Sequence, residues 1–379
     1  MSMKLISISV SATLLASTAL ADAPNVAVDI APIHSLVARV MDGVGVPSLI
    51  VQPGASPHGY SLSPSEAQAL QDADLVFWIG EDLTPWMEGA VETLAEGAMV
   101  TTLLEAEGTK LLEFREGALF EAHDHGDHAG HDHHGHEDHA AEGHDHDHDH
   151  DHDHDHDHAK VEGVADDDHD HDHGEEQAEA HDAGHHDHDH DEDHAHDDHA
   201  GHDHAGHDHG EHDPHAWLSP ENASTWLNLI AAQLSSADPD NAGAYFANAA
   251  AARDEMTALA AEISTALEPV RGGNFIVFHD AYQYFETDFD FPAAGAITLG
   301  DATDPSPARI SEIQGRIQDE GIDCVLSEPQ FNPGLVATVL DGVEASTGVI
   351  DPLGSALEPG PALYPQLLRD MAATLAECL

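Results

Sequence analysis

Basic side chains are scarce in this sequence. Only 10 of the 379 residues are Lys or Arg, whereas 74 are Asp or Glu, and the formal net charge is −64. A chain with this charge repels nucleic acid and anionic membranes and attracts cations. Solubility alone would account for acidity, but it does not account for 36 histidines. We therefore expect cations, and no nucleic acid, among the partners.

Long apolar runs are missing except at the N-terminus. There, Lys4 precedes an apolar stretch at 5–20, and Ala19-Leu20-Ala21 has the A-x-A pattern of a cleavage site. This pattern predicts a signal peptide at 1–21 that is removed after Ala21. No other stretch approaches the ~18 apolar residues that cross a bilayer. The mature protein is expected to be exported and soluble.

Cysteine is also rare, with Cys324 and Cys378 as the two examples. In an exported protein such a pair is expected to form a disulfide. The bond would tie a strand-like segment at 323–326 to the C-terminal helix. Two distant thiols are too few for a structural zinc site.

Apolar residues almost vanish between 121 and 213, which we call the His/Asp-rich segment. All but four of the histidines lie in it, and His-Asp dipeptides recur, as at 144–147. Without apolar surface to bury, such a chain cannot offset the entropy lost on ordering. We expect a disordered insertion.

The rest of the chain alternates strand-like and helix-like patterns, which favours parallel sheets covered by helices. We predict an α/β protein in which a long rigid helix joins two β/α lobes with four-stranded sheets of parallel type. The N-terminal lobe spans 22–237 and contains the insertion, the linking helix spans 238–268, and the C-terminal lobe spans 269–379. The strands are expected at 26–30, 47–51, 75–79, 274–278, 294–298, 324–327 and 348–350.

The same patterns set the expected helices. An Ala-rich stretch of about 30 residues after Asp238-Pro239 is the linking helix, and Ser63 is a plausible N-cap of the second helix. The helices are expected at 33–41, 64–72, 85–94, 220–236, 239–267, 281–285, 307–320, 333–346 and 362–377.

Four histidines lie outside the His/Asp-rich segment: His34, His58, His215 and His279. His58 and His279 each follow an apolar strand pattern, His215 precedes a helix, and Asp351 follows another strand. Ligands of open α/β sheets gather beyond the carboxyl ends of strands, so these side chains are candidates for one crevice. Three neutral imidazoles with a carboxylate or water suit Zn²⁺. Periodicity alone leaves open whether they converge, because a single histidine is more often a packed polar residue.

Five motifs carry a resemblance to a known family. The sequence resembles the ZnuA-like zinc-binding proteins of ABC importers, within the cluster A-I solute-binding proteins, over essentially the whole mature chain. The cysteine positions and the His/Asp-rich segment also look like that family. The resemblance implies two β/α lobes on a rigid helix, a periplasmic location and zinc held by His58, His215 and His279. The motifs lie at 54–64, 213–220, 278–285, 327–331 and 351–354.

Two positions differ among the members of this family. Some members place a glutamate ligand immediately before the first histidine, where this chain has Pro57. The fourth position then falls to Asp351 or to water, with Asp351 slightly favoured. Manganese-binding relatives carry a carboxylate where this chain has His279, and a third imidazole favours zinc.

Two further residues receive their own interpretations. His34 is expected to be structural or to support a ligand without binding metal itself. Glu328 either orients a ligand histidine through a hydrogen bond or caps a helix, and the sequence leaves both open.

The function expected from these features is high-affinity zinc capture in the periplasm and delivery to the membrane permease of an ABC importer, by a protein that is not an enzyme and acts as a monomer. The His/Asp-rich segment would scavenge or buffer zinc near the main site, or else only add solubility. One alternative is an exported zinc hydrolase or hydratase, because three histidines and water also form catalytic zinc sites. Others are a manganese-binding transport protein and a zinc store without an importer.

Overall fold

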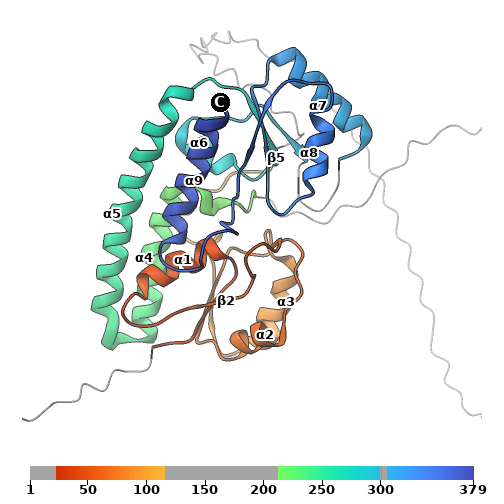
Figure 1. Cartoon of the computed structure of the whole chain (residues 1–379). Coiled ribbons are helices and arrows are strands. Elements are labelled where there is room, and N and C mark those ends of the chain that lie inside the picture. Colours follow the sequence, from red (N-terminus) through yellow and green to blue (C-terminus); the bar gives the residue numbers. More distant parts are fainter. Residues whose placement is uncertain (1–22, 116–211, 299, 301–304) are drawn as a thin grey trace, which may run out of the picture. The chain divides into compact units, whose positions relative to one another are not determined.

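The computed structural model describes residues 23–115, 212–298, 300 and 305–379. The predicted signal peptide lies outside these residues, and so does the His/Asp-rich segment apart from His212 and Asp213. Figure 1 shows two sheets with helices packed around them. Both sheets are four-stranded and all-parallel, which confirms the predicted α/β class. No helix among the described residues is long and apolar enough to span a bilayer.

The first sheet has the strand order β2-β1-β3-β4. Three helices connect or flank these strands, and each carries proline in its first turn, where the missing N–H costs no helical hydrogen bond. The strands are β1 (Val26–Val28), β2 (Ser48–Leu49), β3 (Leu75–Trp78) and β4 (Met99–Thr102), and the helices are α1 (Ala31–Val40), α2 (Pro64–Gln71) and α3 (Pro85–Leu94).

Ser63 caps α2, as the sequence predicted, and the structure shows that it does so within a capping box. The Ser63 side chain accepts a hydrogen bond from the Glu66 N–H, and the Glu66 carboxylate accepts one from the Ser63 N–H. Two N–H groups without helical partners are thereby satisfied.

The second sheet repeats the order of the first as β6-β5-β7-β8. Its strands are β5 (Phe275–His279), β6 (Gly295–Thr298), β7 (Cys324–Ser327) and β8 (Ser346–Val349), and its helices are α6 (Gln283–Phe289), α7 (Pro307–Glu320), α8 (Pro333–Val339) and α9 (Leu363–Cys378).

Two expectations about these elements were wrong in detail. The strand β4 was not predicted, because Met99 and Val100 are exposed at the edge of the sheet and the segment has no alternating apolar pattern. The helix expected at 333–346 ends at Val339, and the strand expected at 348–350 is β8, which begins earlier, at Ser346. A turn around Gly342, whose φ is +81°, ends the helical path.

Two long helices lie between the sheets in sequence, α4 (Pro220–Ala237) and α5 (Ala242–Leu267). The 26 residues of α5 extend about 39 Å at 1.5 Å per residue. The helix contacts α1 from the first half of the chain and α6 and α9 from the second half. This confirms that a long helix joins the lobes.

The core is shared between the lobes. Alternate β1 side chains face opposite sides of the sheet, so Val26 and Val28 join one cluster and Ala27 another. The largest cluster continues from the first sheet through α4, α5 and α9 to the second sheet. Each lobe also has its own outer cluster.

The C-terminal helix fastens both ends of this arrangement. Cys378 on α9 forms a disulfide with Cys324 on β7, as the sequence predicted. The Tyr364 N–H at the start of α9 donates to the Ser35 hydroxyl on α1. One helix therefore contacts elements of both lobes.

Candidate metal centre

Three histidines from distant parts of the chain converge. One ligand atom each from His58, His215 and His279 lies within 4.8 Å of the other two. The Nε2 atoms of His215 and His279 are 3.4 Å apart, and the rings of His58 and His215 have centroids 5.6 Å apart. Three ligand atoms this close to one another are spaced so that they could hold one ion.

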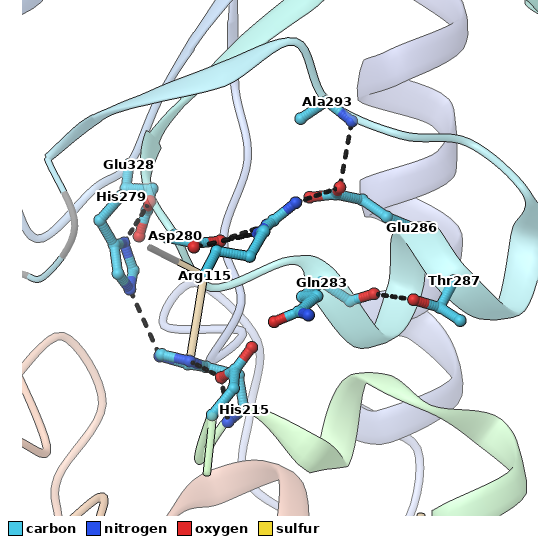
Figure 2. Close-up of polar contacts among 10 residues, drawn as sticks. Arg115, His215, His279, Asp280, Gln283, Glu286, Thr287, Ala293 and Glu328 are labelled. Atoms are coloured by element: carbon cyan, nitrogen blue, oxygen red, sulfur yellow. Dashed lines mark hydrogen bonds and ion pairs between the residues drawn. The ribbon is translucent and has the colours of Figure 1, made fainter. Parts of the chain in front are cut away.

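His279 is the last residue of β5 and is buried. Its Nδ1 lies 2.7 Å from Oε1 of Glu328, which follows β7 on the neighbouring strand (Figure 2). The carboxylate fixes the ring orientation and leaves Nε2 facing His215. Of the two roles open for Glu328, the structure shows a side chain that orients His279.

His215 has a carboxylate partner of the same kind. It directly precedes the 3₁₀ turn Ala216–Leu218, and its Nδ1 lies 2.7 Å from Oδ1 of Asp213. Burial raises the pKa of Asp213 to about 6, although the His215 N–H and the Arg115 charge lower it. The sequence analysis did not assign this role to Asp213. The Asp-Pro-His spacing was the available signal, because it places the carboxylate two residues from the ring.

His58 belongs to a loop and not to a strand or helix. The indole N–H of Trp86 donates to the Pro57 carbonyl at 2.7 Å, and the His58 N–H donates to the Ser56 hydroxyl at 3.3 Å. His58 is half-buried, whereas His215 and His279 are buried. The backbone contacts around Pro57 therefore position this ring.

A buried ionic cluster lies behind His279. Arg115 donates to both carboxylate oxygens of Asp280 and to Glu286 (Figure 2). Burial raises the pKa values of both acids above their usual values, although the Arg115 guanidinium opposes this rise. Since Asp280 adjoins His279, the cluster supports the ligand strand. Sequence reasoning missed Arg115, which gives no local signal.

The described residues on either side of 116–211 pair with each other. Glu113 and His212 form an isolated antiparallel bridge, and the Asp213 N–H donates to the Leu112 carbonyl at 2.8 Å. The Leu112 N–H in turn donates to the Tyr284 hydroxyl. The described chain stops at Arg115 and resumes at His212, three residues before His215. The bridge between Glu113 and His212 places these two points side by side.

Asp351 and His34 lie outside the three-histidine group. The Asp351 carboxylate accepts hydrogen bonds from the N–H groups of Leu353, Gly354 and Ser355 and from the Ser355 hydroxyl. His34 is buried on α1 with Nε2 3.1 Å from the Pro47 carbonyl. That contact fits the structural role expected for His34.

The histidines line a small cavity of about 10 Å³. This volume accommodates about one water molecule or one ion. The walls combine imidazoles with apolar side chains, including Phe331, which stacks on Phe278 at 4.3 Å between ring centroids. The cavity is lined by Ser56, Pro57, His58, His215, Trp217, His279, Glu328, Gln330, Phe331, Pro352 and Leu353.

Comparison with known families agrees with this geometry. Residues 26–378 match the family described as ZnuA, zinc-uptake complex component A, periplasmic. A high-affinity zinc uptake system protein of Paracoccus denitrificans is 40% identical over 360 residues, which cover 95% of this chain and 93% of the relative. A protein of the same description from Brucella abortus is 41% identical over 355 residues, with 94% and 91% covered.

Solved structures share the fold at low sequence identity. A crystal structure of ZnuA superposes with a TM-score of 0.62 at 18% identity and covers 94% of this chain and 99% of its own. A Mn-bound periplasmic metal-binding protein from Candidatus Liberibacter asiaticus superposes with a TM-score of 0.60 at 17% identity, with 93% and 98% covered.

Proposed function

This chain belongs to the ZnuA family of periplasmic zinc-uptake components, and from that premise we propose that it binds one zinc ion through His58, His215 and His279 and delivers the ion to an ABC-type permease. Zinc is the cargo of such a protein and not a catalytic group. Solute binding accounts for the features of the site better than turnover does.

The convergence of three imidazoles supports this proposal most directly. Their ligand atoms lie within 4.8 Å of one another, and neutral imidazole nitrogens suit zinc, which they bind at about 2.0–2.1 Å. Asp213 and Glu328 hold two of the rings through Nδ1, so Nε2 is the atom through which each of these rings would coordinate zinc. A pre-oriented site loses little entropy when it binds the ion.

The fourth coordination position falls to Asp351 or to water. Both carboxylate oxygens of Asp351 already accept hydrogen bonds within the loop at 351–355. Coordination by Asp351 would require these bonds to break, whereas a water molecule requires only space beside the ion. These contacts favour water.

Two alternative functions fit the same contacts less well. A hydrolase or hydratase also needs a general base beside the metal, and the carboxylates of Asp213 and Glu328 are already engaged with His215 and His279. Manganese prefers carboxylate and carbonyl oxygens, whereas the converging group consists of three imidazoles. Zinc import therefore remains the favoured function.

The composition of the His/Asp-rich segment supports a second role. Its imidazoles and carboxylates are weak, interchangeable zinc ligands, and its C-terminal end, His212 and Asp213, is held by Glu113 and Leu112 next to His215. Tethering raises the effective ligand concentration near the site. The segment would scavenge zinc at low supply and pass it to the three histidines, or buffer an excess.

The main site is tested by titrating the metal-free mature protein with zinc in competition with a chelator. We expect one tight site that the His215→Ala variant lacks. His34→Gln is the matched control, because its amide can still donate to the Pro47 carbonyl and it should bind zinc like the wild type. Equal binding by His215→Ala and the wild type would refute the proposal.

The segment is tested by replacing its residues 121–211 with a short glycine linker, which keeps His212 and Asp213. We expect the number of bound ions to fall while the one tight site remains, and growth of a zinc-starved host to weaken. An unchanged number of ions would exclude a metal-binding role for the segment. If zinc uptake by the host required this protein but no ABC permease, delivery of zinc to a permease would be excluded.

A further inference from the structure

Gln330 lies in the cavity wall and has no role in the contacts described so far. It follows β7 by three residues and lines the same cavity as the three histidines. Its Oε1 is shielded from solvent and has no hydrogen-bond partner among the described residues. A buried carbonyl oxygen without a partner is destabilising, and in folded proteins it commonly marks the place of a water molecule or an ion.

Each carboxylate near the histidines has at least one oxygen engaged, although Glu328 Oε2, like Gln330 Oε1, is buried without a hydrogen-bond partner among the described residues. Glu328 Oε1 contacts His279, and Asp213 Oδ1 contacts His215. Asp351 is held by the N–H groups of its own loop. Gln330 therefore provides a neutral acceptor that lines the cavity and remains available to a new donor.

We propose that Gln330 positions the water molecule that completes zinc coordination, by accepting a hydrogen bond from it through Oε1. This inference rests on the proposed zinc site. Zinc draws electron density from a bound water and strengthens it as a donor, so the bond to an amide oxygen forms best when the metal is present. Gln330 is a positioning residue and not a ligand.

A neutral acceptor has a consequence for release. An amide oxygen orients the water without adding negative charge, so with three neutral imidazoles and a water the complex keeps the charge of the ion. A carboxylate at the same place would attract the ion and could replace the water directly. The Gln330 amide thereby limits affinity to a range that permits delivery.

The experiment uses the mature full-length protein in two measurements. In the first the protein is loaded with Co²⁺, whose visible absorption reports the number and type of ligands. In the second its zinc affinity is measured in competition with a chelator. In Gln330→Leu we expect an altered Co²⁺ spectrum and zinc binding about 2- to 10-fold weaker, the effect of one hydrogen bond. In Gln330→Glu we expect zinc to bind at least about 2- to 10-fold more tightly than in the wild type. We also expect zinc to be released more slowly. Gln68→Leu, on the exposed face of α2, is the control and should match the wild type.

Two results would overturn the proposal. One is a Gln330→Leu protein with the spectrum and zinc affinity of the wild type. The other is a spectrum that changes in Asp351→Asn and not in Gln330→Leu, which would make Asp351 the fourth ligand. Thermal unfolding of the metal-free variants separates a misfolded protein from a changed site. A wild-type protein without any tight site would instead refute the proposed function itself.

Discussion

The two lobes have the same strand order but use the end of their first strand differently. In the C-terminal lobe, β5 ends at His279, whose ring contacts Glu328 just after the third strand, β7. In the N-terminal lobe, β1 is followed by Asp29, whose carboxylate accepts hydrogen bonds at 2.7 Å from the N–H groups of Ile30 and Ile79. Ile79 comes just after the third strand, β3.

This difference separates a ligand position from a structural one. At both places a polar side chain links the first strand of a sheet to the residue after the third strand. In the C-terminal lobe the link leaves His279 Nε2 facing the cavity, whereas in the N-terminal lobe it consumes both oxygens of a fully buried carboxylate. The N-terminal lobe therefore presents its ligand, His58, from a loop. Equivalent positions in a repeated sheet need not have equivalent functions.

The largest effect is expected from removing a strand-borne ligand. His279→Ala should weaken zinc binding by about a thousandfold, or about 4 kcal/mol, because it also leaves Glu328 buried without its partner. His58→Ala should weaken binding about a hundredfold, because His215 and His279 stay oriented. Zinc competition titrations measure both. Equal losses would show that the loop ligand is as well held as the strand ligand.

The structural link in the N-terminal lobe should show itself in the pH dependence of stability. Burial raises the pKa of Asp29 from 3.8 to about 7, against the backbone N–H groups that lower it. A raised pKa means that the folded state binds more protons, so the stabilising contribution is complete below pH 4 and is lost as pH rises through 7. Three pKa units correspond to roughly 4 kcal/mol.

Asp29→Asn removes this titration and tests it. In urea unfolding of the metal-free proteins, the stability of the wild type minus that of the variant should fall between pH 4 and pH 7. Asp319→Asn, on the exposed side of α7, should show no such change. A difference that is flat across this range would mean that Asp29 titrates in the folded protein as it does in the unfolded chain.

A smaller effect is expected from the carboxylates that orient the rings. Glu328→Gln should weaken zinc binding about 10- to 100-fold, as partners of ligand histidines commonly do. Asp213→Asn should weaken it less, because an asparagine oxygen can still accept from the His215 N–H. Chelator competition ranks the two variants. The reverse order would assign the greater orienting role to Asp213.

The smallest effect is expected from the support of the His58 loop. Trp86→Phe removes the indole donor to the Pro57 carbonyl and keeps most of the apolar surface, so zinc binding should weaken about 2- to 10-fold. Trp78→Phe is the matched control, since its indole N–H donates to Thr102, away from the histidines. Similar losses in both variants would point to a general effect on the lobe.

The sequence predicted most elements because their signals are local. Proline and serine at the helix starts and apolar runs in the buried strands gave α3, α7 and β7 with the bounds that the structure has. The edge strand β4 and the end of α8 depend on contacts with a neighbouring strand and on a turn, which local patterns do not carry. The motifs that resemble the ZnuA-like family singled out three histidines that spacing alone left undecided.

By itself the sequence determined the fold class, the disulfide partners and the residue types that suit zinc, because composition, periodicity and motif order are properties of the chain. Only the tertiary structure placed the nitrogens of His58, His215 and His279 within 4.8 Å, paired two of them with Asp213 and Glu328, and put Arg115 between two buried acids. Those contacts join residues that lie up to 221 positions apart in the chain. Their geometry follows from how two sheets and a shared core pack together, which no local pattern encodes.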